Sequence, residues 1–192
     1  IDASYMIRNT FITKGPAYIL SVIKNIIIPK AKELIIEYDG KSFNGWQKQP
    51  NKLNIQGEIE KAIGEITGEE IDLIASGRTD AGVHSLGQTA NFKTESNIPI
   101  EKFAIAINSK LKKSIVIKSA EEVDERFHSR YSVKSKTYRY IINNSENGTA
   151  IYRNLEYNFS QKLNIEEMNK AAQYFLGEHD FRKICSKVES LI

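Results

Sequence analysis

Cysteine is almost absent from this sequence, and histidine is scarce. The single cysteine, Cys185, excludes a disulfide within the chain and fits a reducing compartment. The three histidines, His84, His128 and His179, are far apart in the sequence and form no pattern of metal ligands. We therefore expect no metal site.

Long hydrophobic runs are also missing. Residues 18–28 read YILSVIKNIII, a stretch that Lys24 interrupts and that is shorter than the roughly 20 apolar residues needed to cross a bilayer. No clear small-residue cleavage site follows it, so a signal peptide is not predicted. We leave residues 1–32 as an unassigned leader. A membrane-associated protein led by this stretch is one alternative, which partition into a soluble fraction would test.

A large charge of one sign is lacking too. The chain carries 27 basic and 24 acidic side chains, a net charge of +3, so overall charge does not identify a nucleic-acid-binding protein. The 192 residues are 41% hydrophobic, which is enough to bury the core of one or two small domains.

From residue 33 onward, apolar residues follow strand and helix periodicities in turn. Helices are predicted from the Asn54 cap to Gly68 and from Ile100 to Leu111, and strands at residues 33–38, 71–75, 88–92, 114–123 and 131–143. Apart from the last strand, this order is that of a ferredoxin-like fold. It predicts an α+β domain with an antiparallel sheet, both helices on one face, and the other face free, as in RNA-recognition domains.

A second subdomain is expected after a polar, turn-rich linker at residues 144–149. The first subdomain covers residues 33–143, and the second starts at residue 150 and runs to residue 192. Its helix is marked by the capping pair Asn164 and Glu167 and by Gly177 at its end. Only 15 residues follow Gly177, so we expect this second, similar subdomain to be incomplete.

Two segments carry residues suited to chemistry. In Ser76–His84, two glycines flank Arg78 and Asp80, which offer a planar cation and a carboxylate able to act as nucleophile or base. On spacing alone, an ordinary polar turn with a surface ion pair is the more common explanation. In residues 126–140, basic and aromatic residues alternate, which suits either phosphate binding and base stacking or a solvated edge strand.

Several ordered motifs resemble those of the tRNA pseudouridine synthase A family. The resemblance spans about residues 33–181 and rests on the following strings: Glu37-Tyr38-Asp39-Gly40, Gly45-Trp46-Gln47, Ile55-Gln56-Gly57, Gly77-Arg78-Thr79-Asp80-Ala81-Gly82-Val83-His84, Arg126-Phe127-His128-Ser129-Arg130-Tyr131, Lys136-Thr137-Tyr138-Arg139-Tyr140 and Gly177-Glu178-His179-Asp180-Phe181. Several motifs in one order are far more specific than any single motif.

The resemblance implies a cytoplasmic isomerase with the pseudouridine synthase fold. Such an enzyme converts uridine to pseudouridine in the anticodon stem-loop of tRNA, works as a homodimer, and needs no cofactor because no redox chemistry or group transfer occurs. Its partner would be tRNA. Residues 1–32 and the residues after Phe181 do not resemble the family, whose chains continue further and complete the active-site cleft. The alternative is therefore a catalytically incomplete RNA-binding remnant of the same fold.

The resemblance also assigns roles to single residues. Asp80 would be the nucleophile, attacking either the ribose or the base, and Arg78 would fill the gap left by the flipped nucleotide. Tyr138 would stack on the target uracil. Unstacking a base costs a few kcal/mol, so a stacking partner and a gap-filling residue make physical sense. Further substrate contacts are expected from the basic segment, namely Arg126, His128, Arg130 and Lys136.

Overall fold

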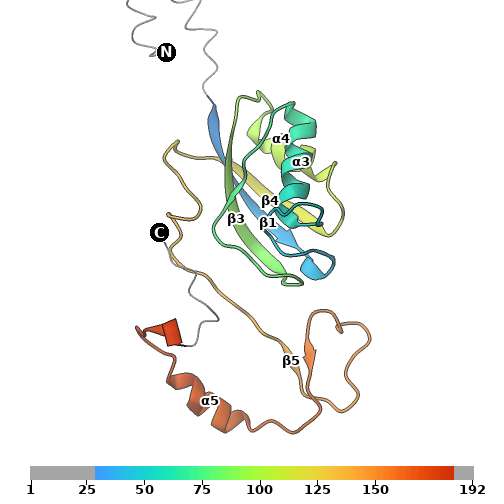
Figure 1. The fold of residues 1–192 in the computed structure, drawn as a ribbon, viewed down its shortest axis with the longest axis vertical. Helices are drawn as coiled ribbons and strands as arrows, with labels where there is room; N and C mark the ends of the chain where they lie inside the picture. The colour runs from blue at the N-terminus through green and yellow to red at the C-terminus, as the bar shows by residue number, and fades with distance from the viewer. Residues whose placement is uncertain (1–28, 184–192) are drawn as a thin grey trace, which may run out of the picture. The chain divides into compact units, whose positions relative to one another are not determined.

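The computed structural model of the chain describes residues 29–183, in two compact units that divide between Lys136 and Thr137 (Figure 1). The unassigned leader lies outside the described residues except for residues 29–32. The first unit contains β1 (Lys30–Tyr38), η1 (Gly40–Ser42), α3 (Ile55–Thr67), β2 (Ile74–Ala75), β3 (Ser85–Thr94), α4 (Ile100–Asn108) and β4 (Ile115–Glu122). The second contains β5 (Ile142–Asn143), β6 (Tyr157–Asn158), α5 (Ile165–Gln173) and η2 (Phe181–Lys183).

The first unit has the predicted ferredoxin-like arrangement. Its four strands pair in the order β2-β3-β1-β4, and all three pairings are antiparallel. Both α3 and α4 lie on the same side of this sheet (Figure 1). The α+β fold with both helices on one face, expected from the order of the elements, is thus confirmed.

The core of the first unit lies between the sheet and these two helices. Side chains alternate along β1, so Leu34, Ile36 and Tyr38 are buried beneath the helices. They meet the apolar stripes of α3 and α4, which include the fully buried Ile59 and Phe103. Fully burying side chains of this size contributes about 1.5–3 kcal/mol each. This packing makes the sheet a rigid base for the loops at its ends.

Local signals fix the ends of α3 as predicted. The Asn54 side chain accepts a hydrogen bond from the Gly57 amide at 2.8 Å, which satisfies a donor that the helix itself leaves free. Gly68 closes the helix in the left-handed region, at φ 76°. The first turn of α3 is therefore held in place directly after the loop that contains Trp46.

The strand predicted at residues 131–143 is wrong for all but its last two residues. Only Ile142–Asn143 forms a strand, and residues 131–140 are exposed. A strand needs a partner for its backbone groups, and among the described residues none pairs with residues 131–140. The alternation of this segment comes from basic and aromatic side chains that all remain in solvent.

The sheet face opposite the helices is partly covered. Asn91 on β3 pairs with Glu33 and therefore lies on this second face, yet the residue is only 4% exposed. It is covered by Ser129, whose backbone amide and hydroxyl both donate to Asn91 Oδ1, at 2.8 and 2.7 Å. The segment after β4 is thus anchored to the face that was expected to be free.

The second unit has little buried surface within the described residues. β5 and β6 form a parallel two-stranded sheet, and α5 begins at the predicted Asn164 cap, which accepts from the Glu167 amide at 3.1 Å. None of the residues of α5 is buried, including Ile165 and Met168 of its apolar stripe. No helix between residues 29 and 183 is long and apolar enough to span a membrane.

Candidate active site

The Ser76–His84 loop connects β2 to β3 and is tied to β3 at its start. The Ser76 amide donates to the Thr89 carbonyl at 2.8 Å, and the Ser76 hydroxyl donates to Gln88 Oε1 at 2.8 Å. The Gln88 amide nitrogen in turn donates to the Gly77 carbonyl. The backbone before Arg78 is therefore fixed to the rigid sheet.

A second loop, residues 39–46, packs against the middle of this loop. The Trp46 amide donates to the Thr79 carbonyl at 3.0 Å, and the Gly82 amide donates to the Phe43 carbonyl at 3.3 Å. Two glycines permit this contact: a Cβ atom on Gly45 would lie 2.5 Å from the Thr79 carbonyl oxygen, and one on Gly40 would collide with the Val83 carbonyl. The glycines of the two motifs thus let two backbones touch.

Tyr38, a buried residue of β1, is hydrogen-bonded to the Thr79 side chain. Its hydroxyl shares a hydrogen bond of 2.8 Å with Thr79 Oγ1, and its buried ring packs on Trp46 with centroids 5.9 Å apart. Burial raises the pKa of the Tyr38 phenol, while hydrogen bonds with Thr79 and Ser85 lower it by less. The phenol therefore stays neutral at physiological pH and remains a hydrogen-bond donor.

Asp80 and Arg78 stand exposed on this fixed backbone. The Asp80 carbonyl accepts from the Val83 amide at 3.2 Å, which closes a turn that begins at Asp80. Neither the Asp80 carboxylate nor the Arg78 guanidinium has an ion pair or a side-chain hydrogen bond within residues 29–183. The surface ion pair expected of an ordinary polar turn is thus not formed among the described residues, and both side chains are accessible to a ligand. At the end of the loop, His84 Nδ1 lies 3.1 Å from Asp39 Oδ1.

Gln56 and Glu60 on α3 support the site, and sequence reasoning gave neither of them a role. The Gln56 side chain accepts from the Lys48 amide at 3.1 Å and donates to the Leu73 carbonyl at 3.2 Å. Glu60 Oε1 accepts from Gln56 at 2.9 Å and from the Leu73 amide at 3.2 Å. These bonds, buried except for the partly buried one from Lys48, join α3 to the loop after Trp46 and to the chain that enters β2. The Ile55-Gln56-Gly57 motif was the available signal.

The basic segment is held near the sheet at some residues and free at others. Ser129 is anchored on Asn91, and the His128 and Tyr131 rings lie 4.2 Å apart. Arg126 Nε is paired with Asp124 at 3.0 Å, and hydrogen bonds from Arg126 lower the pKa of the Asp124 carboxyl. Of the predicted substrate contacts, Arg126 is therefore partly neutralised within its own turn.

Lys136 and Tyr138 belong to different units of the structure. Lys136 lies beside Gly77, since a Cβ atom on Gly77 would be 2.6 Å from the lysine Nζ. Tyr138 lies in the second unit, beyond the division at Lys136, and the residue is 81% exposed. Its stacking role stays a prediction.

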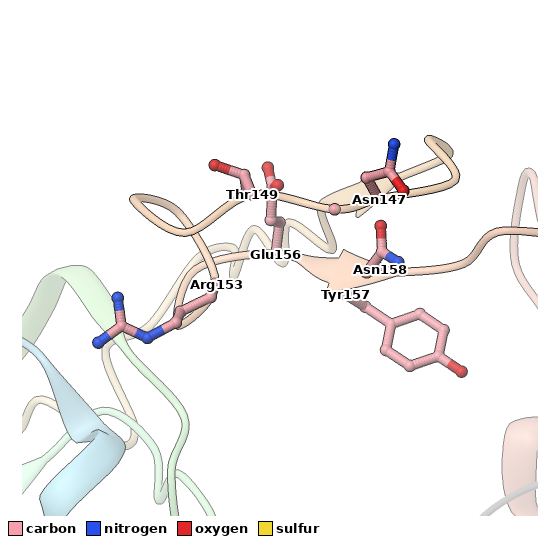
Figure 2. A pocket seen from close by; sticks show the side chains of 7 residues that line it. Asn147, Thr149, Arg153, Glu156, Tyr157 and Asn158 are labelled. Atoms are coloured by element: carbon pink, nitrogen blue, oxygen red, sulfur yellow. The ribbon is translucent and has the colours of Figure 1, made fainter.

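A shallow pocket in the second unit contains none of the predicted site residues. It is lined by residues 147–149, residue 153 and residues 156–158 (Figure 2). Its polar lining comprises Asn147, Thr149, Arg153, Glu156 and Asn158. Between residues 29 and 183, no cluster of three or more histidine, cysteine, aspartate or glutamate residues is suited to hold a metal ion.

The fold and these loops define an α+β domain that presents a carboxylate and an arginine on one rigid turn, next to a basic segment. The sequence profile of the family described as tRNA pseudouridine synthase matches residues 34–132, about half of the chain. The chain therefore belongs to the tRNA pseudouridine synthase family.

Curated relatives agree with this assignment. Over 153 residues, the chain is 56% identical to tRNA pseudouridine synthase A of Caldicellulosiruptor saccharolyticus, an alignment that covers 80% of this chain and 63% of that protein. It is 54% identical over 149 residues to tRNA pseudouridine synthase A of Acetivibrio thermocellus, covering 78% of this chain and 61% of that protein. The chain thus spans just over three fifths of the length of these relatives.

Proposed function

We propose that this chain isomerises uridine to pseudouridine in tRNA, with the Asp80 carboxylate as nucleophile. The observation that carries the proposal is an exposed carboxylate with no ion pair among residues 29–183, on a backbone that is fixed at Thr79 from two sides, in a chain of this family. Holding a nucleophile in the reactive position supplies rate by removing the entropy of encounter. The fixed backbone and free carboxylate fit that requirement.

The reaction balances without a cofactor. Asp80 forms a covalent bond to the target nucleotide, and the bond from ribose C1′ to uracil N1 breaks. The uracil then turns and rejoins C1′ through C5, the hydrogen on C5 leaves as a proton, and N1 gains a proton. Asp80 is released unchanged, so nothing is oxidised or reduced.

The other site residues would handle the RNA. A paired uridine must leave the base stack before Asp80 reaches it, at a cost of a few kcal/mol. Arg78, two residues before Asp80, would occupy the gap, and Tyr138 would stack on the extruded uracil. His128, Arg130 and Lys136 would contact the strand around it. We propose the anticodon stem-loop as the target, a homodimer as the working form, and the cytoplasm as the location.

The test is tritium release from tRNA labelled at uridine C5, because forming the C1′–C5 bond expels that hydrogen. Asp80→Asn keeps the size and the fold but removes the nucleophile, so we expect at least a roughly thousandfold loss of release. Binding of tRNA, measured separately, should change little. Asp72→Asn, at another exposed aspartate, is the matched control and should retain activity.

Two outcomes would refute parts of this proposal. Substantial tritium release by Asp80→Asn would exclude Asp80 as the nucleophile. Tight tRNA binding by the unaltered chain without any release would instead favour an RNA-binding role that lacks catalysis.

A further inference from the structure

The ammonium group of Lys136 lies over the backbone of Gly77, one residue before Arg78. A Cβ atom on Gly77 would be 2.6 Å from Lys136 Nζ and 3.3 Å from its Cε, so the lysine occupies the space that any other side chain would take. Gly77 is not among the glycines with positive φ, so its conformation alone does not require glycine. Its missing side chain instead makes room for Lys136.

Lys136 has no anionic partner in the described part of the chain. No carboxylate there pairs with its ammonium, although Arg126, in the same basic segment, is paired with Asp124. The neighbouring Arg78 is likewise unpaired within residues 29–183. Two cations with no counter-ion thus flank the start of the loop that presents Asp80.

We infer that the Lys136 ammonium, seated on Gly77, binds one backbone phosphate of the RNA next to the nucleotide that Asp80 attacks. This inference rests on the proposed function and names the contact that places the strand at the nucleophile. A lysine ammonium is a compact point charge suited to a phosphate oxygen, whereas an arginine can also pair in a bidentate way.

The geometry gives two independent ways to disturb this site. Lys136→Gln removes the charge and keeps a long polar side chain. Gly77→Ala keeps the charge but displaces the ammonium, and the fold should tolerate it because a lysine end is flexible. If both act through the same phosphate contact, their effects will not add.

The experiment measures tRNA affinity over a series of salt concentrations for Lys136→Gln, Gly77→Ala and the double variant. The control is Lys61→Gln, at an exposed lysine on α3 in the helix layer, on the opposite side of the sheet from Ser129. Losing one phosphate contact should reduce the slope of log affinity against log salt by about 0.7–0.9. The affinity gap between the unaltered chain and Lys136→Gln should therefore shrink about threefold between about 50 and about 200 mM salt.

Gly77→Ala should weaken binding in the unaltered background and have no further effect once Lys136 is glutamine. Equal slopes for Lys136→Gln and Lys61→Gln, or additive losses in the double variant, would overturn the inference. Failure of the unaltered chain to bind tRNA would refute the proposed function as well. If Lys136→Gln binds tRNA with the same salt slope as the unaltered chain, the phosphate site alone is refuted.

Discussion

Replacing Gly45 with alanine tests whether contact between the two loops sets the position of Asp80. Gly45 has φ 84°, and an added methyl group would lie 2.5 Å from the Thr79 carbonyl oxygen and 3.1 Å from the Asp80 carbonyl carbon. These neighbours are backbone atoms of a loop tied to β3, so they cannot move aside as a flexible side chain would. The substitution must push the Asp80 loop away or distort its own loop.

The structure supplies a matched control for the backbone strain. Gly68 has φ 76°, but a Cβ atom there would meet nothing within 4 Å. An alanine in the left-handed region costs about 1–2 kcal/mol, and this strain alone applies to Gly68→Ala. Gly45→Ala adds an overpacking cost of about 1–3 kcal/mol, so its total loss of unfolding free energy should be about 2–5 kcal/mol.

Urea denaturation and tritium release from tRNA measure the two consequences separately. Gly68→Ala should lose stability and keep its turnover at temperatures where it remains folded, because Gly68 closes the end of α3 opposite to its first turn, and the first turn is the one that bonds to Gly45 and Trp46. Gly45→Ala should lose turnover even where it remains folded, since Asp80 moves with Thr79. If Gly45→Ala lost no more stability than Gly68→Ala and kept full turnover, the reasoning about loop contact would be refuted.

Three further predictions concern single contacts. Tyr138→Leu should lower pseudouridine formation more than Tyr138→Phe because stacking needs the ring, and equal losses would implicate the hydroxyl instead. Ser129→Ala removes the 2.7 Å hydroxyl bond to Asn91 and should cost about 1 kcal/mol in urea unfolding, and no measurable loss would contradict an anchor there. The buried Lys32 donates a hydrogen bond of 3.2 Å to the Glu122 carboxylate, and this bond lowers the pKa of Glu122. Glu122→Gln removes that carboxylate and its ion pair. That stabilisation is present above the ordinary pKa of 4.5 and is lost as pH falls through the lowered folded pKa, so the stability difference from the unaltered chain should shrink in acid, and a pH-independent difference would contradict it.

Sequence patterns predicted the first unit well because its signals are local. Periodicity located α3, α4 and the four strands, and Asn54 and Gly68 marked the ends of α3. The same method failed at residues 131–143, because alternation reports a possible strand but not whether a sheet edge is available to pair with it. The length of β2 was overestimated in a similar way, since only Ile74–Ala75 of the predicted strand at residues 71–75 pairs with β3.

The residues proposed for the site came from motifs, whereas the contacts that hold them did not. The resemblance of the Ser76–His84 segment to a family motif singled out Asp80 and Arg78, and their roles stay predictions. It did not reveal that Thr79 is held by Tyr38 and Trp46. These partners lie more than thirty positions away in the sequence, where spacing carries no information about contact.

By itself, therefore, the sequence determined the order of helices and strands, the ends of α3 and the chemical groups that the Asp80 loop offers, because each depends on neighbours within a few residues. Only the tertiary structure decided what those groups face. It brought Gly45 against Thr79, joined Gln56 and Glu60 to the chain entering β2, laid Ser129 over Asn91 and put Lys136 over Gly77. Each of these contacts forms only when packing of the core brings distant segments together, and that packing depends on the whole set of buried side chains.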